Sequence, residues 1–218
     1  MGLLRNTDNS AQRYDRIVEE ATRLFVEQSF EETTMQDIAE RAGVGIENLY
    51  KYFTTKRDLF FTVALSFWNK RYLVNEEVLT DDLSGIQSVE KLIDEEIRIF
   101  FENTERYVFL EKFDNYVKHY LRKDQINDVK QVEFLERYER ACKHDESVWK
   151  MVLLSGLSDH SIRSDVDMSL LLHTLSIMTM SVFQKFANRR VIIDQDDEYK
   201  MEEIIIILKK MIMEYLKA

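Results

Sequence analysis

The chain contains no proline, only five glycines and a single cysteine among its 218 residues. Average usage would give roughly 11 prolines and roughly 15 glycines in a chain of this length. Folds with many turns and strands need these two residues at their corners, so we expect an all-α protein built from long helices. One cysteine, Cys142, excludes a disulfide within the chain and is typical of a reducing compartment.

Charge and hydropathy argue against two further classes of protein. The 40 acidic side chains outnumber the 30 basic ones, and the net charge of −10 gives no general attraction to nucleic acid. Residues 1–10 lack the apolar segment of a secretory signal, and the uncharged run over 168–183 is too short to span a bilayer. We therefore expect a soluble, cytoplasmic protein with no membrane partner.

Catalytic and cofactor motifs are also missing. The sequence has no G-x-x-x-x-G-K-[ST] or G-x-G-x-x-G loop, no H-E-x-x-H and no G-x-S-x-G. The donors of 144–146 and 159–160 are adjacent, and adjacent residues on a helix diverge, so they make poor joint ligands. Acidic pairs such as Glu95-Glu96 are expected on solvated faces. We predict no enzymatic activity, no metal site and no cofactor.

Apolar residues spaced three and four apart predict about nine helices. The expected helices cover 14–25, 35–42, 46–53, 56–79, 86–101, 109–120, 132–156, 168–188 and 201–216. Thr34 is a candidate N-cap, with Asp37 in the place of the usual capping-box glutamate. The four isoleucines of 204–207 also fit a buried strand, but the resumed spacing beyond Lys209-Lys210 favours a helix.

Two short helices, 35–42 and 46–53, are joined by a tight turn that contains Gly43 and Gly45, which is the plan of a helix-turn-helix. The stretch 16–63 resembles the DNA-binding domain of the tetracycline-repressor (TetR) family. The matching residues are Ile17, Ala21, Leu24-Phe25, Phe30, Thr34, Ile38-Ala39, Ala42-Gly43-Val44, Leu49-Tyr50, Tyr52-Phe53, Lys56 and Leu59. The resemblance implies a DNA-binding domain over 1–55 and a helical effector-binding and dimerisation domain over 56–218.

The N-terminal end of the second short helix would enter the major groove. There Asn48 can pair with an adenine edge, Glu47 can accept from a cytosine amino group, and Ile46 can touch a thymine methyl. Hydroxyl and ammonium groups at family-matched positions would contact phosphates. Three alternatives stay open: Thr34 as a cap only, Tyr52 as a packed ring and Glu47 as a solvated charge. The candidate DNA-binding residues are Thr34, Gly45, Ile46, Glu47, Asn48, Tyr50, Lys51, Tyr52 and Lys56.

One departure from the family pattern concerns charge. Where the family usually has Ser-x-Gly-Thr, this chain has Gly45-Ile46-Glu47-Asn48, and residues 1–60 carry eight basic and eleven acidic side chains. We expect a repressor that binds its double-stranded operator as a dimer, with affinity falling steeply as salt rises. The alternative is a family member that no longer binds DNA as a repressor and acts as an activator or through protein contacts.

The last two predicted helices are apolar over most of their circumference, which favours a homodimer interface; a single-chain core is the alternative. Its candidates are Leu171, Leu175, Met178, Val182, Ile205, Leu208 and Ile212. A small, largely apolar effector would bind among aromatic residues of the larger domain and release the repressor by moving helix 56–79, although aromatic stripes are also typical of cores. The pocket candidates are Phe67, Phe100, Phe109, Phe113, Tyr116, Trp149 and His173.

Overall fold

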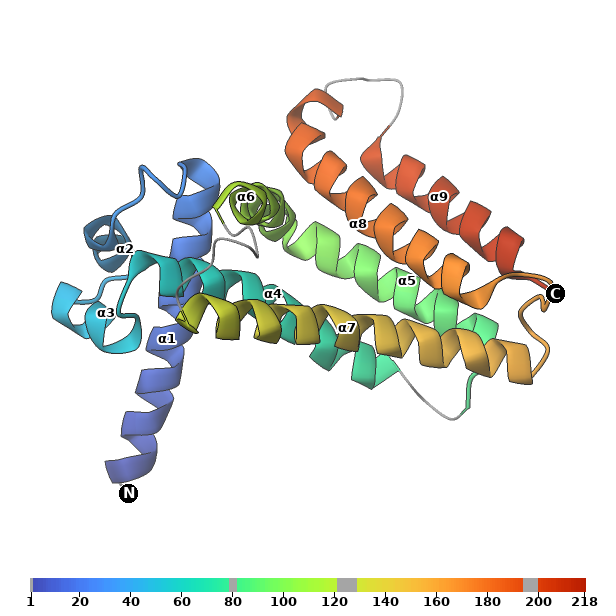
Figure 1. Cartoon of the computed structure of the whole chain (residues 1–218), viewed down its shortest axis with the longest axis horizontal. Helices are drawn as coiled ribbons and strands as arrows, with labels where there is room; N and C mark the ends of the chain where they lie inside the picture. The colour runs from blue at the N-terminus through green and yellow to red at the C-terminus, as the bar shows by residue number, and fades with distance from the viewer. Residues whose placement is uncertain (1, 79–81, 121–128, 194–199) are drawn as a thin grey trace. The chain divides into compact units, whose positions relative to one another are not determined.

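The computed structural model describes residues 2–78, 82–120, 129–193 and 200–218 (Figure 1). Nine helices and no strand lie within these ranges, which confirms the all-α prediction. None of the helices described is long and apolar enough to cross a membrane. The predicted charged stretch 122–128 and polar stretch 194–198 lie outside the described residues. The helices are α1 (Gly2–Glu27), α2 (Met35–Arg41), α3 (Ile46–Tyr52), α4 (Lys56–Val78), α5 (Gly85–Glu102), α6 (Thr104–Tyr120), α7 (Val129–Ser158), α8 (Met168–Ile193) and α9 (Met201–Leu216).

The chain forms two compact units. The first comprises Met1–Phe67 and Phe109–Leu135, and the second comprises Trp68–Val108 and Glu136–Ala218. Helix α4 therefore contributes to both units, as do α6 and α7. The predicted domain boundary after residue 55 stays a prediction.

The core of the first unit is aromatic. On α1, Ile17, Ala21 and Phe25 lie at a spacing of four residues and are fully buried. The ring of Phe60 on α4 makes edge contacts with Phe25 and Phe109, with centroids 4.9 and 5.1 Å apart. Such offset and edge contacts stabilise ring pairs beyond the burial of their area. This cluster joins α1, α4 and α6 behind the two short helices.

The core of the second unit is built from α5, α7, α8 and α9. Val89 and Leu92 of α5 are buried with Leu153 of α7, Leu172 of α8 and Leu216 of α9 in one apolar cluster. The four isoleucines of 204–207 lie within α9, so the strand alternative is wrong. Their helical spacing places Ile205 in the core and leaves Ile204, Ile206 and Ile207 exposed.

Several helix ends differ from the predicted ones, including the start of α6 at Thr104 rather than at residue 109. Helix α1 begins at Gly2 rather than near Tyr14, because the polar residues before Tyr14 give no apolar periodicity but contain no proline to stop a helix. Helix α7 continues past Gly156 to Ser158, so the predicted closure at Gly156 is wrong. A Cβ on Gly85 would lie 2.0 Å from the backbone nitrogen of Gly156. The missing side chains thus let α5 and α7 touch.

The start of α5 is also held by a carboxylate from the turn after α7. Asp159 accepts hydrogen bonds from the backbone N–H of Gly85 (2.6 Å) and of Ser161 (2.9 Å), and Ser161 Oγ accepts one from Ile86 N–H (3.0 Å). The Ser161 hydroxyl, together with the backbone N–H groups of Gly85 and Ser161, holds the pKa of Asp159 below its usual value. A carboxylate at a helix N-terminus is further favoured by the helix dipole.

We expect this cap to make stability depend on pH. Because the pKa of Asp159 is lowered in the folded state, the carboxylate stabilises the fold above the unfolded pKa of about 3.9. That contribution is lost as pH falls through the lower, folded pKa. Urea unfolding of the wild type and of Asp159→Asn should therefore show a stability difference that is full near pH 6 and shrinks below about pH 4.

Asp15→Asn, on the exposed part of α1, is the control for the loss of one negative charge. A stability difference between wild type and Asp159→Asn that stays constant from pH 6 to the acid limit would contradict the assigned cap.

Candidate nucleic-acid interface

Local capping fixes the two short helices. Thr34 Oγ1 accepts a hydrogen bond from Asp37 N–H (3.1 Å), while Asp37 Oδ2 accepts from Thr34 N–H (2.9 Å), so the predicted capping box is present. The Thr34 hydroxyl and backbone N–H lower the pKa of Asp37. Gly43 has φ +60°, a conformation that other L-residues rarely adopt, and Gly45 occupies the N-cap of α3. This turn sets the direction in which α3 leaves α2.

Helix α3 is anchored by one side chain and exposes the rest. Leu49 is fully buried, whereas Glu47, Asn48 and Lys51 are exposed and the Tyr50 side chain is 51% exposed. Ile46 and Tyr52 are half-buried. A short helix held from behind, with polar and aromatic groups facing outward, has the form required to enter a DNA groove.

Three of the predicted contact residues have partners within the first unit. Lys51 Nζ donates to Asn48 Oδ1 (3.1 Å), which occupies one of the two lone pairs of this amide oxygen and leaves the other for a base. The hydroxyls of Tyr52 and Ser10 lie 3.0 Å apart, and the Tyr52 ring makes an edge contact with Tyr14 at 6.2 Å. Tyr52 is therefore positioned by α1.

Lys56 lies at the start of α4 and points to the turn before α2. Its Nζ donates to the backbone oxygens of Thr33 (2.6 Å) and Glu31 (3.2 Å) and lies 4.5 Å from the ring centroid of Phe30. Burial lowers the pKa of this amine. An ammonium group has three donors, so one N–H remains for a phosphate beyond its two backbone partners.

Much of the basic charge near α2 is already neutralised. Arg41 forms ion pairs with Glu20 (3.1 Å) and Glu27, and Arg23 forms them with Glu19 and Glu20. The Arg41 guanidinium holds the pKa of Glu27 below its usual value and has its own pKa raised by that carboxylate. These pairs leave less net positive charge for phosphates, so binding would depend more on the residues of α3.

The second unit carries an apolar groove between α8 and α9. It has a volume of about 430 Å³ and is lined by Val166, Asp167, Leu170, Leu171, Thr174, Leu175, Met178, Leu208, Met211, Ile212 and Tyr215. Five of the seven predicted interface residues lie in this groove. Of the other two, Ile205 is buried and Val182 is half-buried. The sequence-based prediction missed the exposed rim, formed by Leu170, Met211 and Tyr215.

The seven predicted pocket residues are divided between the two units. Phe67, Phe109, Phe113 and Tyr116 are buried in the first unit, whereas Phe100 and Trp149 are buried in the second. His173 is exposed on α8, where Nδ1 lies 2.8 Å from the backbone oxygen of Ser169. Their role in binding an effector stays a prediction.

Glu96 is a polar group that the sequence analysis misplaced. It was expected on a solvated face, but its side chain lies in the core at 1% exposure, where Oε1 accepts a hydrogen bond from Trp149 Nε1 (3.3 Å). Its position four residues after Leu92 and four before Phe100 places it on the apolar stripe of α5. This spacing in the sequence indicates that Glu96 is buried.

Comparison with known proteins identifies the N-terminal part of the chain. Residues 17–63 match the family model described as bacterial regulatory proteins, tetR family. These residues carry a TetR-family DNA-binding domain. A repressor named KstR2 from Rhodococcus jostii is 24% identical to this chain over 165 residues, or 76% of this chain and 75% of the relative. KstR2 of Mycolicibacterium smegmatis is 25% identical over 161 residues, or 73% and 72%.

Solved structures support the same fold. PfmR from Thermus thermophilus has a TM-score of 0.69 at 20% identity, covering 93% of this chain and all of PfmR. FadR from Bacillus subtilis, solved in complex with stearoyl-CoA, has a TM-score of 0.58 at 16% identity and covers 94% and 98% of the two chains. KstR2 of Mycobacterium tuberculosis, a ketosteroid regulator, has a TM-score of 0.64 at 15% identity and covers 95% of each.

The described part of the chain contains no cluster of three or more His, Cys, Asp or Glu side chains that could hold a metal ion. The candidate sites described above lie at α3, with its exposed polar side chains, and at the groove between α8 and α9.

Proposed function

We propose that this protein is a dimeric, DNA-binding transcriptional repressor that a small, largely apolar ligand releases from its operator. The observation that carries the proposal is the arrangement of α3, in which buried Leu49 anchors a helix whose polar side chains face solvent. The fold and the family match support a transcriptional regulator, and this geometry supports direct contact with base edges.

The proposed contacts divide into two groups. Ile46, Glu47 and Asn48 lie at the start of α3 and would contact base edges, because this end of a recognition helix reaches deepest into the major groove. Hydroxyl, ammonium and backbone groups would hold phosphates on either side and so set the register of the helix. The phosphate contacts would come from Thr34, Gly45, Tyr50, Lys51, Tyr52 and Lys56.

The homodimer is supported by the groove between α8 and α9. Its rim residues Leu170, Met211 and Tyr215 are apolar or aromatic and exposed in the single chain. Pairing of α8 and α9 with a second copy would cover these side chains, and two-fold symmetry would present two α3 helices to two half-sites.

The effector is proposed to be small and largely apolar. The described core of the second unit is rich in aliphatic and aromatic side chains, and two proteins of similar fold are a ketosteroid regulator and a complex with stearoyl-CoA. Because α4 contributes to both units, a ligand that shifts it would change the spacing of the two α3 helices. Moving the operator-bound population from 99:1 to 1:99 needs about 5.5 kcal/mol of differential binding.

Asn48→Ala tests the contact with bases. A duplex selected from random sequence by the wild-type protein, or DNA flanking its own gene, should be bound about 30-fold or more weakly by the variant. One lost amide–adenine pair per subunit accounts for at least this factor in a dimer. Fluorescence anisotropy at several salt concentrations measures the affinity, and binding to a scrambled duplex should change little.

Asn188→Ala is the matched control, because this exposed amide on α8 makes its contact within its own helix, to Gln184. Equal affinity of wild type and Asn48→Ala for the selected duplex would show that Asn48 does not contact the bases. Failure to select any duplex would favour the second candidate, a chain that acts without binding DNA, which the excess of acidic residues over 1–60 also favours.

A further inference from the structure

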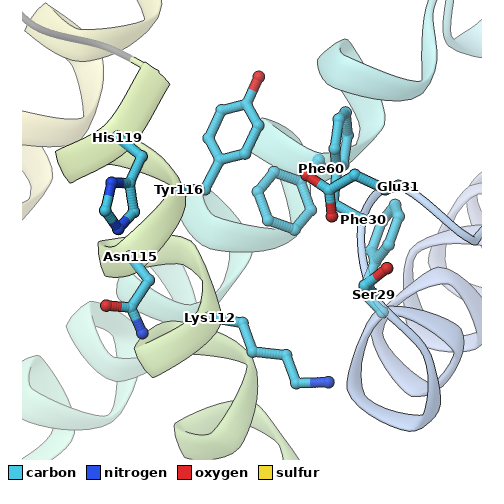
Figure 2. A pocket seen from close by; sticks show the side chains of 9 residues that line it. Ser29, Phe30, Glu31, Phe60, Lys112, Asn115, Tyr116 and His119 are labelled. Atoms are coloured by element: carbon cyan, nitrogen blue, oxygen red, sulfur yellow. The ribbon is translucent and has the colours of Figure 1, made fainter.

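The first unit contains a cavity to which the proposed function gives no role, although one of its lining residues, Tyr116, is also a predicted effector-pocket residue. It has a volume of about 270 Å³ and lies where α6 faces the turn between α1 and α2 (Figure 2). Its lining residues are Phe25, Ser29, Phe30, Glu31, Phe60, Lys112, Asn115, Tyr116 and His119. All nine belong to the first unit, the unit that carries α3.

Aromatic rings form one wall of this cavity. The ring centroids of Phe30 and Phe60 are 4.8 Å apart, and Tyr116 lies 4.9 Å from Phe30 and 5.2 Å from Phe60. Three rings in mutual contact offer faces and edges to a further ring without a change in their own packing. These rings favour a ligand with a flat, apolar group.

Hydrogen-bond donors line the cavity beside the aromatic rings. Lys112, Asn115 and His119 lie on the same face of α6 as Tyr116, as their spacing requires and as Figure 2 shows. Lys112 Nζ donates to the backbone oxygens of Val26 (2.6 Å) and Gln28 (2.7 Å) at the end of α1. An ammonium group has three donors, so one N–H remains to face a ligand.

The charges around the cavity determine whether it favours an anionic or a cationic ligand. Glu31 supplies the one carboxylate among the lining residues, and its side chain is exposed to water, which screens it. The half-buried ammonium of Lys112 lines the cavity, and the ammonium of Lys56 lies 4.5 Å from the centroid of the lining ring of Phe30. These two ammonium groups disfavour an organic cation against the rings.

From this juxtaposition we infer that the cavity binds a one-ring aromatic carboxylate. Its ring lies against Phe30, Phe60 and Tyr116, and its carboxylate accepts hydrogen bonds from the donors of α6. A dry cavity of about 150 Å³ can hold benzene, so the 270 Å³ found here fits a single ring with one substituent. Occupancy of this cavity does not depend on DNA binding, so the inference goes beyond the proposed repressor function.

Titration of the full-length protein with 4-fluorobenzoate, followed by ¹⁹F NMR, tests the site. We expect saturable binding with a dissociation constant on the order of 1 mM, the range for a ligand of this size in a partly open cavity. The matched cation 4-fluorobenzylamine should bind at least about 10-fold more weakly, because it meets Lys112 and Lys56 instead of a counter-charge.

Two variants locate the bound acid. Asn115→Ala combined with His119→Ala removes two exposed donors from α6 and should weaken 4-fluorobenzoate binding about 3- to 10-fold. Glu31→Gln removes the lining carboxylate and should strengthen binding about 2-fold. His173→Ala, an exposed histidine of the second unit, should leave the dissociation constant unchanged.

No saturable signal up to about 20 mM acid, 20 times the expected constant, would overturn the inference. So would tighter binding of the amine than of the acid. Binding that is unaffected by the two α6 substitutions would place the acid elsewhere in the chain and equally overturn it. None of these measurements contains DNA, so a failure here is distinct from a failure of the proposed repressor function.

Discussion

Replacement of Gly85 by alanine is expected to lower the free energy of unfolding by about 3 kcal/mol. The added Cβ would lie 2.0 and 2.1 Å from the N and Cα atoms of Gly156 and 2.8 Å from the carbonyl carbon of Ser155. All three are backbone atoms within α7, so no side chain can rotate away. The helices must separate by about 1 Å, which opens the packed core around them.

A competing effect has the opposite sign but is smaller. Alanine is favoured over glycine inside a helix by up to about 1 kcal/mol, and Gly85 is the first residue of α5. The steric cost exceeds this gain, and separation of the helices also lengthens the hydrogen bond from Gly85 N–H to Asp159. In a thermal scan at fixed protein concentration, the melting temperature should fall by roughly 6–12 °C.

Gly156 offers a comparison within the same contact. Its added Cβ would meet the Cδ1 and Cγ1 atoms of Ile162 at 2.3 and 2.5 Å, and these are side-chain atoms. Gly156→Ala should therefore be milder than Gly85→Ala, and Ile162→Val should recover part of the loss by removing the nearest atom. Gly45→Ala is the control, since its Cβ would meet only Asn48 Nδ2 at 3.9 Å. Unchanged stability of Gly85→Ala would refute the close approach of α5 and α7.

Local signals in the sequence were sufficient for much of the fold. The starts of α2, α3 and α9 match the predicted ones. Each start is indicated by residues next to it in the sequence: a capping box at Thr34, a glycine at position 45 and a polar stretch before Met201. Asp167, the residue before α8, likewise accepts a hydrogen bond from Leu170 N–H (3.0 Å) at the start of that helix. Such features depend on residues three or four apart, which periodicity and capping rules describe.

Features that depend on distant residues could not be predicted in this way. The sequence around Gly156 predicts a helix end. A glycine is needed there because Gly85 of another helix approaches it closely, and no neighbouring residue indicates this contact. In the same way, nothing near Lys112 indicates that its ammonium binds the backbone oxygens of Val26 and Gln28 at the end of α1. The cavity between α6 and the turn after α1 escaped prediction for this reason.

The two apolar helices at the end of the chain show a third kind of limit. A helix that is apolar almost all round gives no contrast between its inner and outer faces. The predicted interface residues Leu171, Ile205 and Ile212 are buried within the unit, whereas Ile207 and Met211 are exposed. Only the packing of α9 against its neighbours separates the two sets.

The exposed side of α9 leads to the second large expected effect. Met211→Glu should convert the protein to a monomer at about 10 μM and weaken operator binding about 100-fold or more, because the two α3 helices then bind independently. Met211 is 64% exposed and lies at the groove between α8 and α9, so the substitution leaves the core intact. A two-fold interface would bury two glutamates without a partner, one from each subunit, at a cost of several kcal/mol per charge.

Sedimentation or light scattering measures the mass, and circular dichroism checks that helix content is retained. Met151→Glu is the matched control: this methionine lies on α7, is 53% exposed and does not line the groove. If Met151→Glu dissociates the dimer while Met211→Glu does not, the subunits pair through α7. If both variants and the wild type sediment as monomers, the groove does not bind a second copy, and each α3 would have to recognise DNA alone.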